Sequence, residues 1–286
     1  MSDLVSKFKS RQDLHQSTYH ANVMRKIGWS VDGKPGTQIY YRTLGPLTVA
    51  KYQRANKVDI ERIKEFRKHH KTLTTYIEPG LNFTYDLGFN VEPFAHSTTS
   101  LIDLAQNEKD LLSSFSQKTR YNITHSLKSN ILNIKSVPLS KVNKQQETDF
   151  FALHSEWSKR KNVVGYSREL LGAVLSSFGS DSTLHLAYDR SNNPLGALLI
   201  LTNDSVSTYY AAFSTTTGYS LYTPTLLTHQ AMLTATDNGS DIFDFGGTYD
   251  PRYPRMYKKW QGFTKFKAGF NPTTIQYPPT KLHLFW

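Results

Sequence analysis

The sequence contains no cysteine, and this absence excludes several kinds of site. Without thiols the chain cannot form disulfides, thiolate metal sites or a cysteine nucleophile. It also lacks a Gly-x-Ser-x-Gly elbow, a Walker phosphate loop, a dinucleotide-binding Gly-x-Gly-x-x-Gly and a His-Glu-x-x-His metal helix. The ordinary hydrolase and kinase interpretations therefore have no support. We expect no bound metal, and we expect His69 and His70, which stand between lysines, to be solvated.

Long apolar runs are lacking as well. No segment approaches the roughly 18 apolar residues that a membrane-spanning helix needs. The first residues, "MSDLVSKFKSRQDL", are polar and charged, unlike a secretory signal. We therefore expect a cytoplasmic protein without integral membrane segments, with a peripheral position at the inner face of a membrane as the alternative.

Two segments lack acidic residues, although the net charge of the whole chain is +11. Residues 111–146 hold six Lys or Arg and no acid, and residues 251–286 hold seven and no acid. The second segment also contains two Trp, three Tyr and four Phe, a mixture suited to a polyanion such as RNA. A solvated basic surface is the alternative. The candidates for contact with tRNA phosphates are Lys118, Arg120, Lys258 and Lys259.

The order of predicted elements repeats itself along the chain. The first part predicts a helix over 18–29 capped by Ser17, paired strands over 37–44 and 47–53, a helix over 58–71 and strands over 72–79 and 97–105. The second part predicts helices within 108–130, 143–161 and 167–178, a strand over 131–137, a three-strand meander over 182–213, a helix over 222–239 and a last strand over 241–247. No heptad run predicts a coiled coil.

This element order is that of a GNAT-type acyltransferase domain. The fold class is therefore expected to be mixed α/β, with two GNAT-like domains and no coiled-coil arm. We assign the first domain to 1–105, with 275–286 as a candidate addition, and the second to 106–274. The place of the coenzyme A pyrophosphate loop holds "STTTGYSLYTP", which has one glycine, so we expect neither coenzyme A nor any other cofactor.

Four segments resemble the Fem family (FemABX): "HQSTYHANVMRKIGW", "SQKTRYNITHSLK", "FDFGGTYDP" and "TKFKAGFNP". The resemblance implies an aminoacyltransferase that forms peptidoglycan cross-bridges. Its co-substrate would be aminoacyl-tRNA, and its acceptor an amine of a peptidoglycan precursor, UDP-linked or lipid-linked. Because the aminoacyl ester is already activated, positioning and charge stabilisation would supply most of the acceleration.

The resemblance assigns Lys267 to stabilising the transition state. In "KFK" we expect a strand, in which Lys265 and Lys267 point to one face and Phe266 packs behind them. Lys265 would then steer phosphate or ribose, and Phe266 would support the substrate site. The alternative is a pair of solvated lysines. We also expect Gly269 to adopt a positive φ, while Gly246 and Gly247 could serve either a turn or close contact with a ligand.

The other residues implied by the resemblance are substrate-binding ones. Glu78, before Pro79, would contact the peptide of the acceptor, with a turn-capping acid as the alternative. Tyr222 would be an active-site tyrosine, with core packing as the alternative. Arg25 and Arg168 lie near the positions of the family's diphosphate-binding residues without matching them.

Two other functions remain open at this point. One is an N-acyltransferase of the same fold that uses another activated acyl donor, including acyl-coenzyme A. The other is a non-enzymatic RNA-binding module, in which the lysines contact phosphates only.

Overall fold

The computed structural model describes residues 3–284 except 56, 58, 84, 163 and 164. The chain forms two compact units. Unit 1 comprises Met1–Thr99, Gly247–Gln261 and Thr274–Trp286, and unit 2 comprises Ser100–Gly246 and Gly262–Thr273. Residues 247–261, which the sequence placed in the second domain, thus fall in unit 1. No helix among the described residues is long and apolar enough to cross a membrane.

The sheet of unit 1 has six strands in the order β1-β2-β3-β4-β13-β5. Its strands are β1 (Ser30–Asp32), β2 (Ile39–Leu44), β3 (Leu47–Gln53), β4 (Thr72–Glu78), β5 (Phe89–Val91) and β13 (Thr280–Leu284). The pairs β1·β2 and β2·β3 are antiparallel, and β3·β4 is parallel. Only the crossover through α3 allows the parallel pair, since a tight turn cannot join parallel strands.

Two helices of unit 1 begin after residues whose side chains accept an N–H group of the first turn. The side chain of Ser17 caps α2 (Thr18–Lys26), as predicted, and that of Asp59 caps α3 (Ile60–His69). Val58, the first residue of the predicted helix, lies outside the described residues. The sequence did not predict α1 (Asp3–Ser10), α10 (Pro254–Tyr257) or the short 3-10 helices Leu14–Gln16 and Lys258–Trp260.

The second sheet has seven strands in the order β12-β6-β11-β10-β9-β8-β7. Its strands are β6 (Thr98–Asp103), β7 (Asn133–Pro138), β8 (Thr183–Tyr188), β9 (Pro194–Asn203), β10 (Val206–Ser214), β11 (Ile242–Asp244) and β12 (Thr273–Gln276). The predicted meander is confirmed, since β8·β9 and β9·β10 are antiparallel.

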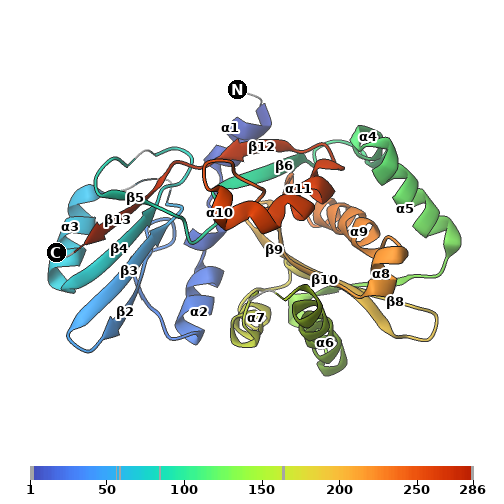
Figure 1. Cartoon of the computed structure of the whole chain (residues 1–286), viewed down its shortest axis with the longest axis horizontal. Coiled ribbons are helices and arrows are strands. Elements are labelled where there is room, and N and C mark those ends of the chain that lie inside the picture. The colour runs from blue at the N-terminus through green and yellow to red at the C-terminus, as the bar shows by residue number, and fades with distance from the viewer. Residues whose placement is uncertain (1–2, 56, 58, 84, 163–164, 285–286) are drawn as a thin grey trace. The chain divides into compact units, whose positions relative to one another are not determined.

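Helices α4 to α9 and α11 accompany this sheet in unit 2 (Figure 1). They are α4 (Glu108–Ser114), α5 (Gln117–Ser129), α6 (Lys144–Lys161), α7 (Arg168–Leu175), α8 (Thr216–Ser220), α9 (Thr223–Asp237) and α11 (Gln261–Ala268), with a 3-10 turn at Leu139–Lys141. One core cluster joins α4, α5 and α9 to the sheet through buried residues that include Phe115, Ile123, Leu227 and Phe243.

The two units repeat one topology, which confirms the two GNAT-like domains that the element order predicted. In unit 1 an antiparallel meander ends in β3, a helix crosses over, and β4 lies parallel to β3 and antiparallel to β13. In unit 2 the meander ends in β10, helices cross over, and β11 lies parallel to β10 and antiparallel to β6. The antiparallel partners of β4 and β11, which are β13 and β6, come from distant parts of the chain, so local sequence cannot predict these pairings.

Candidate active site

The "KFK" segment lies in a helix, so the predicted strand was wrong. Helix α11 spans Gln261–Ala268. Residues three or four apart share a helix face, and Phe263, Phe266 and Phe270 follow that spacing. Phe266 and Phe270 pack on the core of unit 2, with ring centroids 5.5 Å apart. A three-residue alternation of charge and ring cannot distinguish a strand from a short helix, and this packing decided it.

The helical geometry separates the two lysines. Lys265 is exposed, and Lys267 is buried with 8% of its surface accessible. Residues two apart on a helix point in very different directions, so the two ammonium groups cannot face one cleft as predicted. Phe266, between them, is half-buried against the core.

The C-terminal end of α11 is held against the start of α5. The Ser116 amide donates to the Gly269 carbonyl at 2.9 Å, and the Asn271 side chain donates to the Ser114 carbonyl at 2.6 Å. A Cβ at Gly269 would lie 2.5 Å from Thr119 Oγ1. Gly269 is therefore required for close packing, and the positive φ predicted for it is not observed; Asn271 has one instead, at 51°.

Lys267 lies beside Tyr209, within β10, and near Asp244, at the end of the parallel strand β11. Its ammonium nitrogen is 5.8 Å from the centre of the Tyr209 ring. Burial lowers the pKa of Lys267 to about 8, against the attraction of Asp244, the last residue of β11. A cation in such a poorly solvated place interacts strongly with any negative charge that develops nearby. Lys267 is therefore suited to stabilising an anion in a reaction.

Tyr209 marks the irregularity of β10 at this point. The pairing of β10 with β9 shifts register between Tyr209 and Ala211. Burial raises the pKa of Tyr209, and the nearby Tyr219 adds to the effect. Its hydroxyl therefore stays protonated at neutral pH and can act as a hydrogen-bond donor.

Unit 1 contains a second lysine of the same kind. Lys51 lies on β3, and Glu78 ends the parallel strand β4. Burial lowers the pKa of Lys51 to about 8, against the attraction of Glu78. The Lys51 ammonium lies 5.0 Å from the ring of Trp29 and 5.9 Å from that of Tyr40. Each unit thus places a poorly solvated lysine near the acid that ends its parallel strand.

Glu78 itself is fully buried, at 0% exposure. One carboxylate oxygen accepts the Ala95 amide at 2.8 Å, and the other accepts the side-chain amide of Gln53. The Ala95 contact joins strand β4 to the segment that follows β5, and the Gln53 contact joins β4 to β3. Neither partner belongs to a turn at Glu78, and the contact of Glu78 with an acceptor stays a prediction.

The remaining predicted substrate residues lie apart from one another. Tyr222 precedes α9 and contacts His125 of α5 in unit 2, with ring centroids 5.7 Å apart. Arg168, also in unit 2, is exposed, and its guanidinium lies 4.1 Å from the centre of the Phe151 ring. Arg25, in unit 1, is exposed and donates to the Asn22 side chain at 3.1 Å.

Of the four residues predicted to contact phosphates, one is bonded within the protein and three are exposed. Arg120 donates to the carbonyls of Ser113, at 3.1 Å, and Phe115, so its guanidinium closes the C-terminal end of α4. Lys118 is exposed on α5, and Lys258 and Lys259 are exposed in unit 1. Three of the four side chains are therefore accessible to a polyanion.

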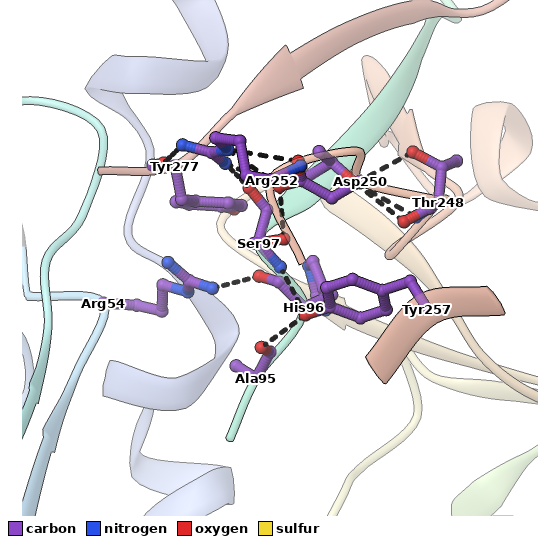
Figure 2. A network of polar contacts seen from close by, with 10 residues as sticks. Arg54, Ala95, His96, Ser97, Thr248, Asp250, Arg252, Tyr257 and Tyr277 are labelled. Carbon is purple, nitrogen blue, oxygen red and sulfur yellow. Dashed lines mark hydrogen bonds and ion pairs between the residues drawn. The ribbon is translucent and has the colours of Figure 1, made fainter. Parts of the chain in front are cut away.

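Sequence reasoning missed a polar network that follows "FDFGG" in unit 1. Figure 2 shows its centre, Asp250, between Arg252 and Ser97. The Asp250 side chain is completely buried and accepts from Ser97 Oγ at 2.5 Å and from Arg252 Nη2 at 2.7 Å. Arg252 also donates to the carbonyls of Tyr277 and Ser97, at 3.0 and 2.9 Å. An Asp two residues before an Arg was the available signal.

The two glycines of "FDFGG" have different roles. Gly246 has a φ of +68°, which a glycine adopts without strain. Gly247 is packed instead: a Cβ there would lie 2.3 Å from the Trp260 ring and 2.5 Å from His96 Cβ. Both are thus explained by the chain itself.

Replacing Gly247 by alanine is expected to destabilise the protein by about 1–3 kcal/mol, because the added methyl group overpacks a closed site. Gly262→Ala is the matched control. No heavy atom lies within 4 Å of a Cβ there, and alanine favours the helix, so a gain of roughly 0.5–1 kcal/mol is expected. Urea unfolding of both variants measures the difference. Equal stabilities would contradict the packing role of Gly247.

The topology defines the class of protein. Two units, each with a meander, a crossover and a parallel strand, form a tandem GNAT-fold protein. The FemAB family profile matches residues 187–280, about a third of the chain, including both closing motifs and Lys267. This match confirms the resemblance to the FemABX family that the quoted motifs predicted, over the segment that carries the two closing motifs.

Solved structures agree on the fold. The crystal structure of FemX is similar with a TM-score of 0.78 at 16% identity, over 99% of this chain and 95% of that one. The C-terminal domain of a provisionally assigned lysylphosphatidylglycerol synthetase from Agrobacterium fabrum has a TM-score of 0.62 at 16% identity, covering 95% and 88%. A tandem GNAT protein from the clavulanic acid biosynthesis pathway has a TM-score of 0.53 at 8% identity, covering 98% and 91%. No curated protein matches by sequence.

Proposed function

We propose that this protein is an aminoacyltransferase that moves an amino acid from aminoacyl-tRNA to an amine of a peptidoglycan precursor. The match to the FemAB family profile supports a transferase of this general type. The observation that carries the proposal is the buried Lys267 in the family motif, beside Tyr209 and Asp244. No cofactor is needed, because the donor ester is already activated.

The chemistry requires one bond to form and one to break. The acceptor amine attacks the ester carbonyl carbon, and the carbonyl oxygen becomes negatively charged. When this intermediate collapses, the C–N bond stays, the ribose oxygen leaves, and the proton lost by the amine ends on that oxygen. A positive charge near the oxyanion lowers the barrier, and a single preorganised donor in comparable sites contributes roughly 3–4 kcal/mol.

Lys267 is the residue we assign to this oxyanion. With a pKa of about 8 it is mostly protonated at pH 7, so it can stabilise the negative charge without a proton transfer. Tyr209, whose ring centre lies 5.8 Å from the ammonium nitrogen, carries a further hydroxyl donor that we assign to this site.

A transfer assay tests donor and acceptor together. The protein is incubated with a mixed pool of charged tRNAs and, in separate reactions, a UDP-linked stem peptide, a lipid-linked precursor and phosphatidylglycerol vesicles. We expect the mass of a peptidoglycan precursor to rise by one or more amino acid residues, through amide bonds that survive mild alkali. The product mass identifies the amino acid and the number added.

Other outcomes would replace the proposal. Transfer from acyl-coenzyme A but not from charged tRNA would indicate the other acyltransferase of this fold. An alkali-labile product formed only on phosphatidylglycerol would support aminoacyl-tRNA as the donor. It would contradict a peptidoglycan precursor as the acceptor. RNA binding without transfer to any acceptor would indicate the non-enzymatic alternative.

A further inference from the structure

Helix α5 presents an exposed stripe in which two basic residues enclose two aromatic ones. Lys118, Tyr121, His125 and Lys128 follow one another at intervals of three, four and three residues, so they share one face of the helix. All four are exposed, and 59% of the Tyr121 surface is accessible. The opposite face of α5 holds Thr119, Ile123 and Ser126, which are buried. The stripe is thus the outer face of a well-anchored helix.

A third ring extends the stripe from another part of unit 2. Tyr121 and His125 lie 5.7 Å apart between ring centroids with their planes at 33°, and His125 and Tyr222 lie 5.7 Å apart edge to face. The loop that carries Tyr222 is tied to α5, because Ser126 Oγ donates to the Leu221 carbonyl at 3.0 Å. Three rings therefore form a continuous row.

Tyr222 holds this position in an unfavourable backbone conformation. Its φ is 57° and its ψ is 23°, in the left-handed region that a bulky residue rarely adopts. It precedes α9 without a side-chain cap, so its side chain does not stabilise the helix start. A ring kept at a strained position indicates that the ring is used.

The positive charge around the row of rings favours an anionic ligand. Lys118 and Lys128 are separated by ten residues of helix, about 15 Å at 1.5 Å per residue. No acidic residue occurs between Leu111 and Gln146. Aromatic faces with lysines at both ends suit a single nucleic acid strand, whose bases stack on rings while its phosphates meet cations. Stacking needs unpaired bases, so a duplex fits this surface less well.

We propose that Lys118, Tyr121, His125, Lys128 and Tyr222 form the surface on which the unpaired end of the donor RNA binds. The inference rests on the proposed function. It gains support from the position of α5, whose first turn is bonded to the end of α11, the helix that carries Lys267. An RNA strand on α5 would therefore approach the end of the helix that holds the catalytic lysine.

Binding of uncharged RNA tests this surface separately from catalysis. The probes are a short single-stranded RNA ending in CCA, the unpaired end that all tRNAs share, and an RNA duplex of equal length. Tyr121→Ala combined with His125→Ala is expected to weaken single-strand binding at least tenfold and duplex binding much less. Lys118→Met and Lys128→Met are each expected to lower the slope of log affinity against log salt by about 0.7.

The controls remove the same chemical groups elsewhere. Phe89→Ala deletes an exposed ring in unit 1, and Lys144→Met deletes an exposed charge in the acid-free segment. Neither is expected to change single-strand affinity more than twofold. Thermal melting checks that every variant is folded.

The outcomes separate this inference from the proposed function. In the transfer assay the stripe variants should raise KM for the charged tRNA and leave kcat nearly unchanged. Unchanged RNA affinity with an unchanged KM would overturn the surface and leave the transferase standing. Weakened RNA binding in a protein that transfers nothing would support the surface and overturn the transferase. If the stripe bound anionic vesicles but not RNA, the proposed RNA-binding surface would also be wrong.

Discussion

Replacing Lys267 by methionine is expected to lower kcat for amino acid transfer by about 10²- to 10³-fold, with little change in the KM for either substrate. Methionine keeps much of the volume of the lysine stem and removes the charge. The loss follows because the oxyanion exists only in the transition state, so its partner contributes little to ground-state binding. Steady-state kinetics with charged tRNA measure both constants.

The pH profile decides whether the lysine acts as a cation or as a base. Because the pKa of Lys267 is lowered to about 8, a cationic role predicts that kcat falls as the pH rises through about 8. A role as general base predicts a rise over the same range. Lys267→Arg, which stays charged at these pH values, should lose part of the activity and also lose the fall above pH 8. A rising limb in the wild type would contradict the electrostatic role.

Lys267→Met should leave the protein folded and make it more stable. A lowering of the lysine pKa from 10.5 to about 8 corresponds to a cost of up to ~3 kcal/mol at pH 7, part of which the loss of the attraction to Asp244 will offset. Below pH 8 the lysine is charged in both states and this cost is fully present. Between pH 8 and 10.5 the folded chain has released a proton that the unfolded chain still binds, so the stability of the wild type rises toward that of the variant. A less stable Lys267→Met would show that the lysine serves the fold.

Asp250→Ala is expected to destabilise the protein by about 1–3 kcal/mol, since it removes the buried carboxylate that accepts hydrogen bonds from Ser97 and from Arg252, whose side chain is 32% exposed. The arrangement in Figure 2 gives the reason: without the carboxylate, the buried Ser97 and the partly exposed Arg252 lose their shared acceptor. Chemical denaturation measures the change. Asp32→Ala is the matched control, because Asp32 and Arg62 also form an ion pair with a similarly exposed arginine, 29% against 32%, but the Asp32 side chain is 43% exposed whereas that of Asp250 is buried. That variant should lose less than about 1 kcal/mol.

The Asp250 network also predicts how stability depends on acid. Burial alone would raise the pKa of Asp250, but hydrogen bonds from Arg252 and Ser97 outweigh it and hold the pKa below 3.8. The contribution of this carboxylate is therefore present above the pKa of the unfolded chain and is lost as the pH falls through the lower pKa of the folded one. Asp250→Ala should flatten the acid limb of the stability curve. If the loss of stability at low pH were the same in Asp250→Ala, other carboxylates would be responsible for it.

The elements that the sequence predicted well are those with a local signal of their own. Ser17 predicted the start of α2, because its side-chain oxygen accepts a hydrogen bond from an amide of the first turn. The long apolar strands β8 to β10 and their short turns announced the meander. The partners of β6 and β13 were beyond such reasoning, because each completes a sheet with a strand far away in the chain.

Sequence reasoning predicted some features of the candidate site and not others. The chemical groups of "KFKAGF" and "FDFGG" were visible in the sequence and led to the family. The conformation of Lys265 and Lys267 was not visible, since an alternating triplet fits a strand and a helix equally well.

The composition, the two acid-free segments, the repeated element order and the closing motifs were determined by the sequence alone, since each depends on which residues are present and in what order. Tertiary structure decided that α11 is a helix, that its Lys267 is buried while Lys265 is exposed, and that Asp250 holds Arg252 and Ser97 together. Phe266 and Phe270 settle the helix by packing against residues up to about 160 positions away, such as Phe115 and Phe245. The lowered pKa of Lys267 has the same origin, because only the folded chain removes water from its ammonium group.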